Sequence, residues 1–229
     1  MADVNKMFSK IEMLACASPE SIAALSSCSQ IKRVKKGGHL FWERDEMDSF
    51  YFSAEGMFSL YKLNGLGEKK VIFLYGPGHM LNEVLLQELP ASVYCEALSD
   101  SSALCFPKQA FIDVMSEDFR LAQAVMSSMA HKIRRLYRQL KNTTGSVRGD
   151  KKIAAKLWKL SKDHGVVCKQ GICIEFELSI TYLADMLGLK RETVSRQMKL
   201  LLDEGVVLQK NKQFIIPDRD KLMDYFKYA

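Results

Sequence analysis

The chain has 229 residues, enough for two domains of ordinary size, and its hydrophobic content of 48% is sufficient for well-packed cores. Its apolar residues form no run long enough to cross a membrane, and the first residues lack the apolar stretch of a signal peptide. We therefore expect a cytoplasmic protein with no membrane contact. The formal net charge of +6 is compatible with a nucleic-acid partner but does not require one.

Six cysteines fit a reducing compartment, in which thiols pack as small apolar groups. No two of them form a Cys-x-x-Cys pair, which argues against a zinc ribbon. A thiol switch through Cys16, Cys28, Cys95 or Cys105 stays open, although buried and inert cysteines are the commoner case.

The first 107 residues predict a β-barrel preceded by short helices. Residues 1–30 show helical spacing of apolar side chains, and Ser18-Pro19-Glu20 has the order of a helix start, with Ser18 as the cap. From Ile31 to about Phe106, short strand-like runs alternate with turn signals such as Asn64-Gly65. Many short strands separated by turns predict a small closed barrel or jelly roll.

Residues 108–145 predict a long helix followed by a hinge. Apolar positions alternate in spacings of three and four at Phe119, Ala122, Met126, Met129, Ile133, Leu136 and Leu140. A seam of this length is what a two-stranded coiled coil requires, so we expect it to join two copies in a homodimer. The alternative is an amphipathic helix packed on its own barrel. The basic run from His131 to Arg138, with Lys141, is expected to be the solvated face.

Residues 146–229 predict a winged helix-turn-helix. Asp150 is expected to cap a helix over 151–163, and two short strands follow around Gly171. In the segment LSITYLADMLGLKRETVSRQMKLLLDEG, Ser179 is the predicted N-cap and Gly188 the turn before a second helix over 190–204. A strand pair with a basic turn at 210–212 then forms the wing.

The second helix of this motif carries the predicted contacts with double-stranded DNA. Arg191, Glu192, Ser195 and Arg196 share its exposed side near the N-terminal end, where a recognition helix meets base edges. Arginine pairs with guanine and glutamate accepts from cytosine, so both arginines are predicted guanine readers and Glu192 a cytosine reader. Phosphate contacts are predicted for Thr181, Lys190, Thr193, Lys210 and Lys212. An ordinary solvated helix face is the alternative.

The segment RETVSR (Arg191 to Arg196), with its surroundings from Leu178 to about Phe214, resembles the cyclic-AMP receptor protein / fumarate-nitrate regulator (CRP/FNR) family of bacterial transcription factors. The resemblance implies an α+β chain in three parts: a double-stranded β-helix sensor, which is a cyclic-nucleotide-binding-like jelly roll, over 1–107, a dimerisation helix over 108–145 and a winged helix-turn-helix over 146–229. It also implies a palindromic site with TGTGA- or TTGA-like half-sites. RNA polymerase is an implied partner if the protein activates transcription.

The resemblance is weaker in the sensor. Gly78 to Glu83 looks like the family's stretch that holds the ribose of a cyclic nucleotide, but Asn82 replaces a glycine. Ala91-Ser92-Val93 stands where an arginine-serine pair would hold the cyclic phosphate, and a buried phosphate without a cation is disfavoured. These departures argue against cyclic AMP and leave open a small apolar or aromatic molecule, or no effector. The candidate effector pocket comprises Asn82, Glu83, Ser92, Tyr94, Leu136 and Tyr137.

Other cofactors and enzyme classes fit the sequence poorly. An iron–sulfur cluster needs grouped thiolates, and Cys16 and Cys28 are too few and too far apart. His79 is the best axial ligand for haem, but a histidine in a turn is more often simply exposed. The sequence has no His-x-His pair, glycine-rich phosphate loop or nucleophile elbow, so no metal site and no enzyme are predicted. The competing class is a sensing module whose C-terminal domain binds protein instead of DNA.

Overall fold

The computed structural model describes residues 7–8, 10–143 and 148–227, with the side chains of 141–143 left out. Contacts divide the chain into two compact units, one within residues 1–62 and 72–144 and the other within 63–71 and 145–229. None of the helices in the described ranges combines the length and the apolar content that a bilayer span needs.

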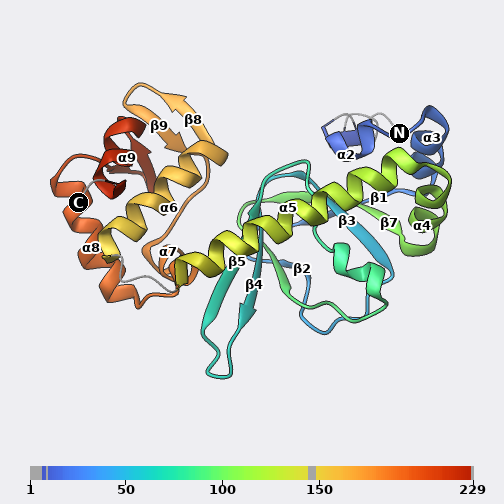
Figure 1. Cartoon of the computed structure of the whole chain (residues 1–229), viewed down its shortest axis with the longest axis horizontal. Helices are drawn as coiled ribbons and strands as arrows, with labels where there is room; N and C mark the ends of the chain where they lie inside the picture. Colours follow the sequence, from blue (N-terminus) through green and yellow to red (C-terminus); the bar gives the residue numbers. More distant parts are fainter. Residues whose placement is uncertain (1–6, 9, 144–147, 228–229) are drawn as a thin grey trace. The chain divides into compact units, whose positions relative to one another are not determined.

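The first unit is built on two sheets that form a jelly roll (Figure 1). Their strand orders are β1-β7-β3 and β2-β6-β4-β5. This arrangement confirms the predicted barrel and its double-stranded β-helix fold. The strands are β1 (Gln30–Val34), β2 (His39–Phe41), β3 (Ser49–Glu55), β4 (Phe58–Leu63), β5 (Lys69–Tyr75), β6 (Tyr94–Ala97) and β7 (Ser101–Pro107). The last residue of β4 and the first three of β5 belong to the stretch 63–71 that contacts assign to the second unit.

Apolar side chains from the strands fill two clusters in this unit. Phe58 on β4 and Cys95 on β6 belong to the cluster inside the roll, where both are fully buried. Phe50, Phe52 and Phe106 belong to the other cluster, which extends to the helices. Burying each phenylalanine contributes about 1.5–3 kcal/mol relative to its exposed state, so these clusters hold the roll together.

The helices of the first unit are α2 (Glu12–Ala15), α3 (Pro19–Cys28), the 3₁₀-helix η1 (Glu83–Gln87), α4 (Lys108–Glu117) and α5 (Phe119–Thr143). The predicted cap of α3 is confirmed, because the Ser18 hydroxyl accepts a hydrogen bond from the Ser21 N–H at 3.0 Å. The single helix expected from residue 108 is wrong, since Asp118 is extended and separates α4 from α5. Its carboxylate accepts hydrogen bonds from the backbone N–H groups of Arg120 and Ser18 at 3.1 and 2.6 Å.

Two faces of α5 have different environments. Leu121 and Val125 are buried against the roll. The predicted seam lies on another face: Ala122 is half-buried, and Phe119, Met126, Met129, Ile133, Leu136 and Leu140 are 37–71% exposed. The expectation that the whole basic run is solvated is wrong at Lys132, whose side chain is 17% exposed.

The second unit has a four-stranded sheet of order β10-β11-β9-β8, and its helix α6 packs against α8 and α9. Its elements are α6 (Gly149–Asp163), β8 (Gly165–Cys168), β9 (Gly171–Ile174), α7 (Ile180–Leu187), α8 (Arg191–Asp203), β10 (Leu208–Lys210), β11 (Gln213–Ile216) and α9 (Arg219–Lys227). The winged helix-turn-helix is therefore present. The predicted cap of α6 is wrong, because Arg148 is the N-cap and Asp150 lies within the first turn.

Candidate nucleic-acid interface

Helix α7 is the first helix of the helix-turn-helix motif. Its N-cap is Ser179, whose hydroxyl accepts a hydrogen bond from the Tyr182 N–H at 3.0 Å. Such a cap stabilises a helix by about 1 kcal/mol, because it satisfies one of the unpaired N–H groups of the first turn. Leu183, Ala184 and Met186 are buried. Gly188 ends α7 with a left-handed φ of 66°, as the sequence predicted.

Helix α8 presents its charged residues to solvent. Val194, Met198 and Leu201 are buried and fix one side of the helix in the core. The four predicted base-contacting residues are all exposed, and they are Arg191, Glu192, Ser195 and Arg196. Lys199 is exposed too, and it follows Ser195 by four residues and therefore extends the same face. We did not single out Lys199 from the sequence, although its helical spacing from Ser195 was the available signal.

The wing is a two-residue hairpin with a basic tip. Lys210 pairs with Gln213, and the two residues between them, Asn211 and Lys212, have φ angles of 49° and 62°. Positive φ at both central positions is the geometry of a type I′ turn, whose twist matches that of the flanking strands. Both lysines of the turn are exposed, so two ammonium groups project from the tip of the wing.

The remaining predicted phosphate contacts lie close to the helix starts. Lys190 is the N-cap residue of α8 and is exposed, and Thr181 is exposed in the first turn of α7. Thr193 is half-buried, so it offers less surface than the others. A helix N-terminus carries partial positive charge and unpaired N–H groups, which suits contact with phosphate oxygens.

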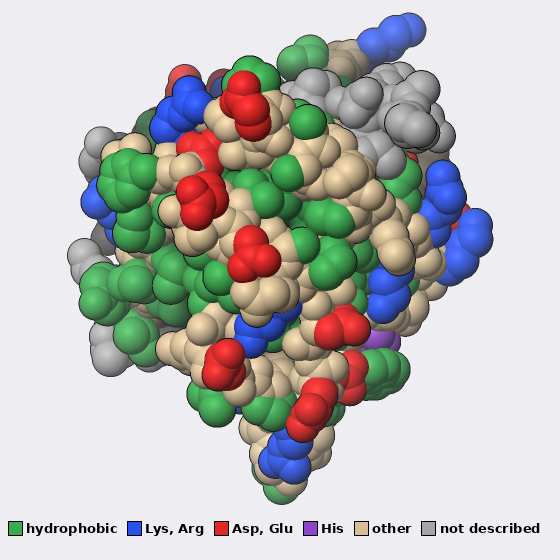
Figure 2. Space-filling model, turned by 90° about the vertical axis from the view of Figure 1, so that its right-hand side faces the viewer, with side chains coloured by type: hydrophobic (Ala, Val, Ile, Leu, Met, Phe, Trp, Pro, Cys, Tyr) green, Lys and Arg blue, Asp and Glu red, His purple; other side chains and the backbone are tan. Residues whose placement is uncertain are grey.

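Positive charge is concentrated in the C-terminal part of the sequence. Residues 144–229 hold 16 Lys and Arg against 11 Asp and Glu, a net charge of +5 out of the total of +6. Figure 2 shows the opposite character at the end of the first unit that carries α3 and α4. Asp and Glu side chains spread across the centre of that face, and Lys and Arg lie mostly toward its edge. A polyanion is therefore attracted to the C-terminal unit in preference to this face.

In the sensor, Glu83 is already held by the chain itself. Its carboxylate accepts a hydrogen bond from the Ser128 hydroxyl at 2.9 Å and forms an ion pair with the Lys132 ammonium. The ammonium also donates to the Met80 carbonyl at 2.8 Å and lies 4.9 Å from the centre of the Tyr75 ring. Burial lowers the pKa of Lys132, and the Glu83 charge opposes that shift. We call this group, Glu83 with Ser128 and Lys132, the α5 clasp.

The other predicted effector residues lie in different environments. Asn82 is buried, and its amide bonds the backbone of Tyr51 and Ser49 at 2.8 and 2.9 Å. Ser92 is exposed, and Tyr94 stacks on Tyr61 with ring centres 4.8 Å apart. Leu136 and Tyr137 are exposed on α5.

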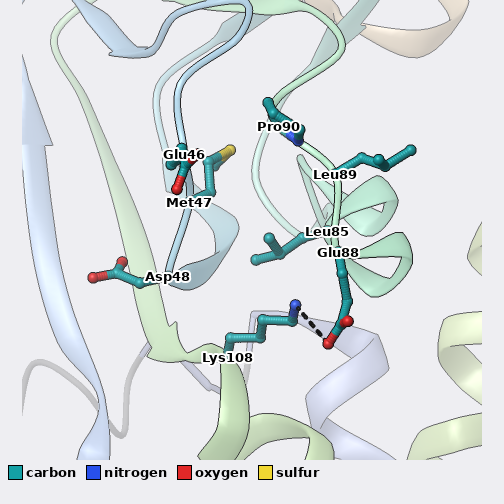
Figure 3. A pocket seen from close by; sticks show the side chains of 8 residues that line it. All are labelled: Glu46, Met47, Asp48, Leu85, Glu88, Leu89, Pro90 and Lys108. Carbon is teal, nitrogen blue, oxygen red and sulfur yellow. Dashed lines mark ion pairs between the residues drawn. The ribbon is translucent and has the colours of Figure 1, made fainter.

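A surface hollow of about 410 Å³ lies elsewhere on the first unit, and none of the predicted effector residues lines it (Figure 3). Its lining residues are Glu46, Met47, Asp48, Leu85, Glu88, Leu89, Pro90 and Lys108. The Lys108 ammonium points toward Glu88, 3.7 Å from its carboxylate, so the basic group of this hollow already has a partner.

The candidate redox and metal groups are dispersed. Burial raises the pKa of the Cys28 and Cys95 thiols, and it raises the pKa of Cys105 to about 11. These three thiols are thus poor nucleophiles, whereas Cys16 is exposed. His79 is exposed beside Tyr75. Within the described residues, no three His, Cys, Asp or Glu side chains gather as they would around a metal ion.

Comparison with known proteins accounts for both units. Residues 31–118 match the cyclic nucleotide-binding domain, and residues 151–225 match the Crp-like helix-turn-helix domain. The chain belongs to the CRP/FNR family. The resemblance stated from the sequence is confirmed, and this CRP/FNR regulator is a transcription regulator with a helix-turn-helix DNA-binding domain, not an enzyme.

Named relatives of this CRP/FNR regulator span most of its length. A cyclic AMP receptor protein of Thermus thermophilus is 26% identical over 190 residues, which cover 82% of this chain and 84% of that protein. An anaerobic regulatory protein of Pasteurella multocida is 23% identical over 196 residues, covering 84% and 70%. The solved structure of a c-di-GMP responsive global regulator of Xanthomonas campestris shares the fold, with a TM-score of 0.75 and 19% identity, covering 88% of this chain and all of that one.

Proposed function

We propose that this CRP/FNR regulator acts as a homodimer in which two copies of α8 read a palindromic DNA site. The observation that carries the proposal is that Arg191, Glu192 and Arg196 are exposed together at the start of α8. This helix is the second of the helix-turn-helix, and a basic wing follows it. Arginine matches guanine and glutamate matches the cytosine amino group, so half-sites like TGTGA or TTGA suit these side chains. Lys190, Lys210 and Lys212 would set the register through phosphate oxygens, together with Thr181 and Thr193.

The exposed seam of α5 supports the homodimer. Seven apolar positions at spacings of three and four lie on one face, and six of them are 37–71% exposed. A monomer in water gains nothing by exposing such a stripe, whereas two copies packed along it would bury it. Two-fold symmetry of the protein then requires two-fold symmetry of the DNA site, with half-sites about one helical turn apart.

The sensor residues support control by a signal other than cyclic AMP. In the family's pattern the Glu83 carboxylate would meet a ribose, but here it is already bound by Ser128 and Lys132. Ala91 provides no cation for a cyclic phosphate, and its backbone bonds Arg44 and Asp45. If the regulator activates transcription, RNA polymerase is the partner that the bound dimer would contact.

A random-site selection with the full-length protein tests the DNA proposal. We expect recovery of a palindrome, and Arg196→Ala should weaken binding to it by about 1–3 kcal/mol and relax one base position in each half-site. Arg219→Ala, at the exposed start of α9, is the matched control and should leave the base preference unchanged. Selection of no sequence, with capture of a protein partner by the C-terminal unit, would favour the competing class.

Sedimentation of the free protein tests the seam. Ile133→Glu places a charge in the middle of the apolar stripe and should convert the dimer to a monomer, because two buried carboxylates would face each other. Arg134→Glu changes an exposed neighbour by a larger charge step and should leave the dimer intact. A wild-type protein that sediments as a monomer at micromolar concentration would contradict the proposal.

A further inference from the structure

Three segments of the second unit meet at the carboxylate of Asp150. This residue lies in the first turn of α6 and is 1% exposed. The Arg148 guanidinium, from the residue before α6, lies 3.0 and 3.3 Å from the two carboxylate oxygens. The Tyr225 hydroxyl on α9 donates to the carboxylate at 2.9 Å. Asp150 therefore fixes the start of α6 against both the preceding chain and α9.

The backbone of Asp150 extends these contacts to the recognition helix. Its N–H donates to the Gln197 side-chain oxygen at 3.1 Å, and Gln197 lies between Arg196 and Met198 on α8. A Cβ atom at Gly149 would stand 3.3 Å from the Gln197 Cγ atom, so a small residue at this position lets α6 and α8 approach closely. A chain of hydrogen bonds thus runs from α9 through Asp150 to α8.

The Asp150 carboxyl is kept ionised in this site. Burial by itself raises the pKa of Asp150, but hydrogen bonds from Tyr225 and from the Lys151 N–H, together with the Arg148 charge, outweigh it and lower the pKa. Hydrogen bonds to a charged acceptor are shorter and stronger than those between neutral groups. The charge of Asp150 therefore strengthens the bonds that hold its backbone in place for Gln197.

Apolar packing and the hydrogen bond to Gln197 restrain α8 in different ways. Val194, Met198 and Leu201 hold the helix in the core, but apolar contacts have little directional preference. A hydrogen bond does have direction, and the bond to Gln197 resists rotation of α8 about its own axis. A rotation of about 10° would move a side-chain tip roughly 6 Å from the axis by about 1 Å. That displacement is enough to break a bidentate contact between Arg196 and a base.

We propose that Asp150 and Gln197 are positioning residues, which set the rotation of α8 and so determine how well the regulator distinguishes its site from other DNA. They act through Arg196 and its neighbours and do not themselves contact a base. The inference rests on the proposed DNA-reading function and adds to it the residues that hold the reading face in place. It also predicts that a change far from DNA, at Tyr225, alters sequence discrimination.

The test compares Gln197→Met, which keeps the length but removes the acceptor, with Gln170→Met at the exposed turn between β8 and β9. Affinities of the full-length proteins are measured for the selected palindrome and for an unrelated duplex, together with the salt slope and Tm. We expect Gln197→Met to lower the ratio of specific to non-specific affinity at least fivefold. Non-specific affinity and the salt slope should not change, because no phosphate contact is lost.

Tyr225→Phe provides an independent arm, since it removes the hydroxyl that holds Asp150 but leaves α8 untouched. Tyr225→Phe should also lower the ratio of specific to non-specific affinity. In the double variant with Gln197→Met, the fold-loss of this ratio should be smaller than the product of the two single fold-losses, because both changes act through Asp150.

Three results would overturn the proposal. The first is a Gln197→Met protein with the same affinity ratio as Gln170→Met. The second is an equal loss of both affinities accompanied by a large fall in Tm, since that would indicate a merely structural role. The third is a wild-type protein that selects no DNA sequence, which would refute the proposed function and this inference together. In the first two cases wild-type selection would still stand.

Discussion

Replacing Lys132 by methionine tests the α5 clasp directly. The change keeps the length of the side chain but leaves the buried Glu83 carboxylate with the Ser128 hydroxyl and no cation. Breaking a buried pair from one side costs about 3–5 kcal/mol, because the remaining charge is uncompensated. The retained Ser128 bond places the expected loss near the lower end, at about 3 kcal/mol. For a domain of this size that corresponds to a fall in Tm of about 10 °C.

The assay follows the fluorescence of Trp42, which lies in the first unit, during urea unfolding of the full-length chain. A Trp158→Phe background removes the signal of the second unit, since these are the two tryptophans of the sequence. Arg134→Met is the control on the exposed side of α5 and should stay within about 0.5 kcal/mol of wild type. The double variant Glu83→Gln with Lys132→Met should recover most of the loss, because neither charge then remains buried. Equal midpoints for Lys132→Met and Arg134→Met would refute the reasoning.

Three further changes test other parts of the fold. Lys212→Gly should stabilise the wing by about 0.5–1 kcal/mol in an unfolding titration, because glycine relieves the strain of the left-handed φ. The same change should weaken DNA binding and reduce the dependence of DNA affinity on salt by a slope of about 1, as a salt titration would show. Ser179→Ala should lower the free energy of unfolding by about 1 kcal/mol, measured by denaturant titration, because α7 loses its cap. The backbone N–H of Ser18 holds the pKa of Asp118 below its usual range. Stability from this contact should therefore be complete above about pH 4 and fall at lower pH, so the Tm difference from Asp118→Asn should shrink there.

The helix-turn-helix was predictable because its signals are local. The Ser179 hydroxyl caps α7 by accepting a hydrogen bond from the N–H of Tyr182, only three residues later. Gly188 occupies the left-handed position that ends α7. The wing tip likewise depends on neighbouring residues, Asn211 and Lys212. The apolar spacing of α8 separates the buried Val194 from the exposed Arg196 without any knowledge of distant contacts. Each of these features depends on residues within one helix or one turn.

The features that the sequence analysis missed depend on partners far away in the chain. Asp118 suits a helix by its spacing, but it accepts a hydrogen bond from Ser18, 100 residues earlier. Asp150 resembles a cap, but Tyr225, 75 residues later, binds its carboxylate. Lys132 lies in a basic run and pairs with Glu83, 49 residues earlier. Periodicity reports which face of a helix is apolar and gives no information on which polar residue finds a buried partner.

Two residues of the clasp, Ser128 and Lys132, lie on the same helix as the seam, and this links the sensor to the expected dimer contact. Successive residues on an α-helix point about 100° apart, so Lys132 can face the roll while Ile133 stays exposed on the seam. Ser128 and Lys132 are four residues apart and grip Glu83 together, so they fix both the rotation and the axial position of α5 on the roll. A ligand that drew Glu83 away would remove this polar restraint on α5, leaving the apolar contacts of Leu121 and Val125 and the bond from Lys132 to the Met80 carbonyl. A signal at η1 would then reach the dimer contact through α5 alone, because this helix carries both the residues that bind Glu83 and the seam.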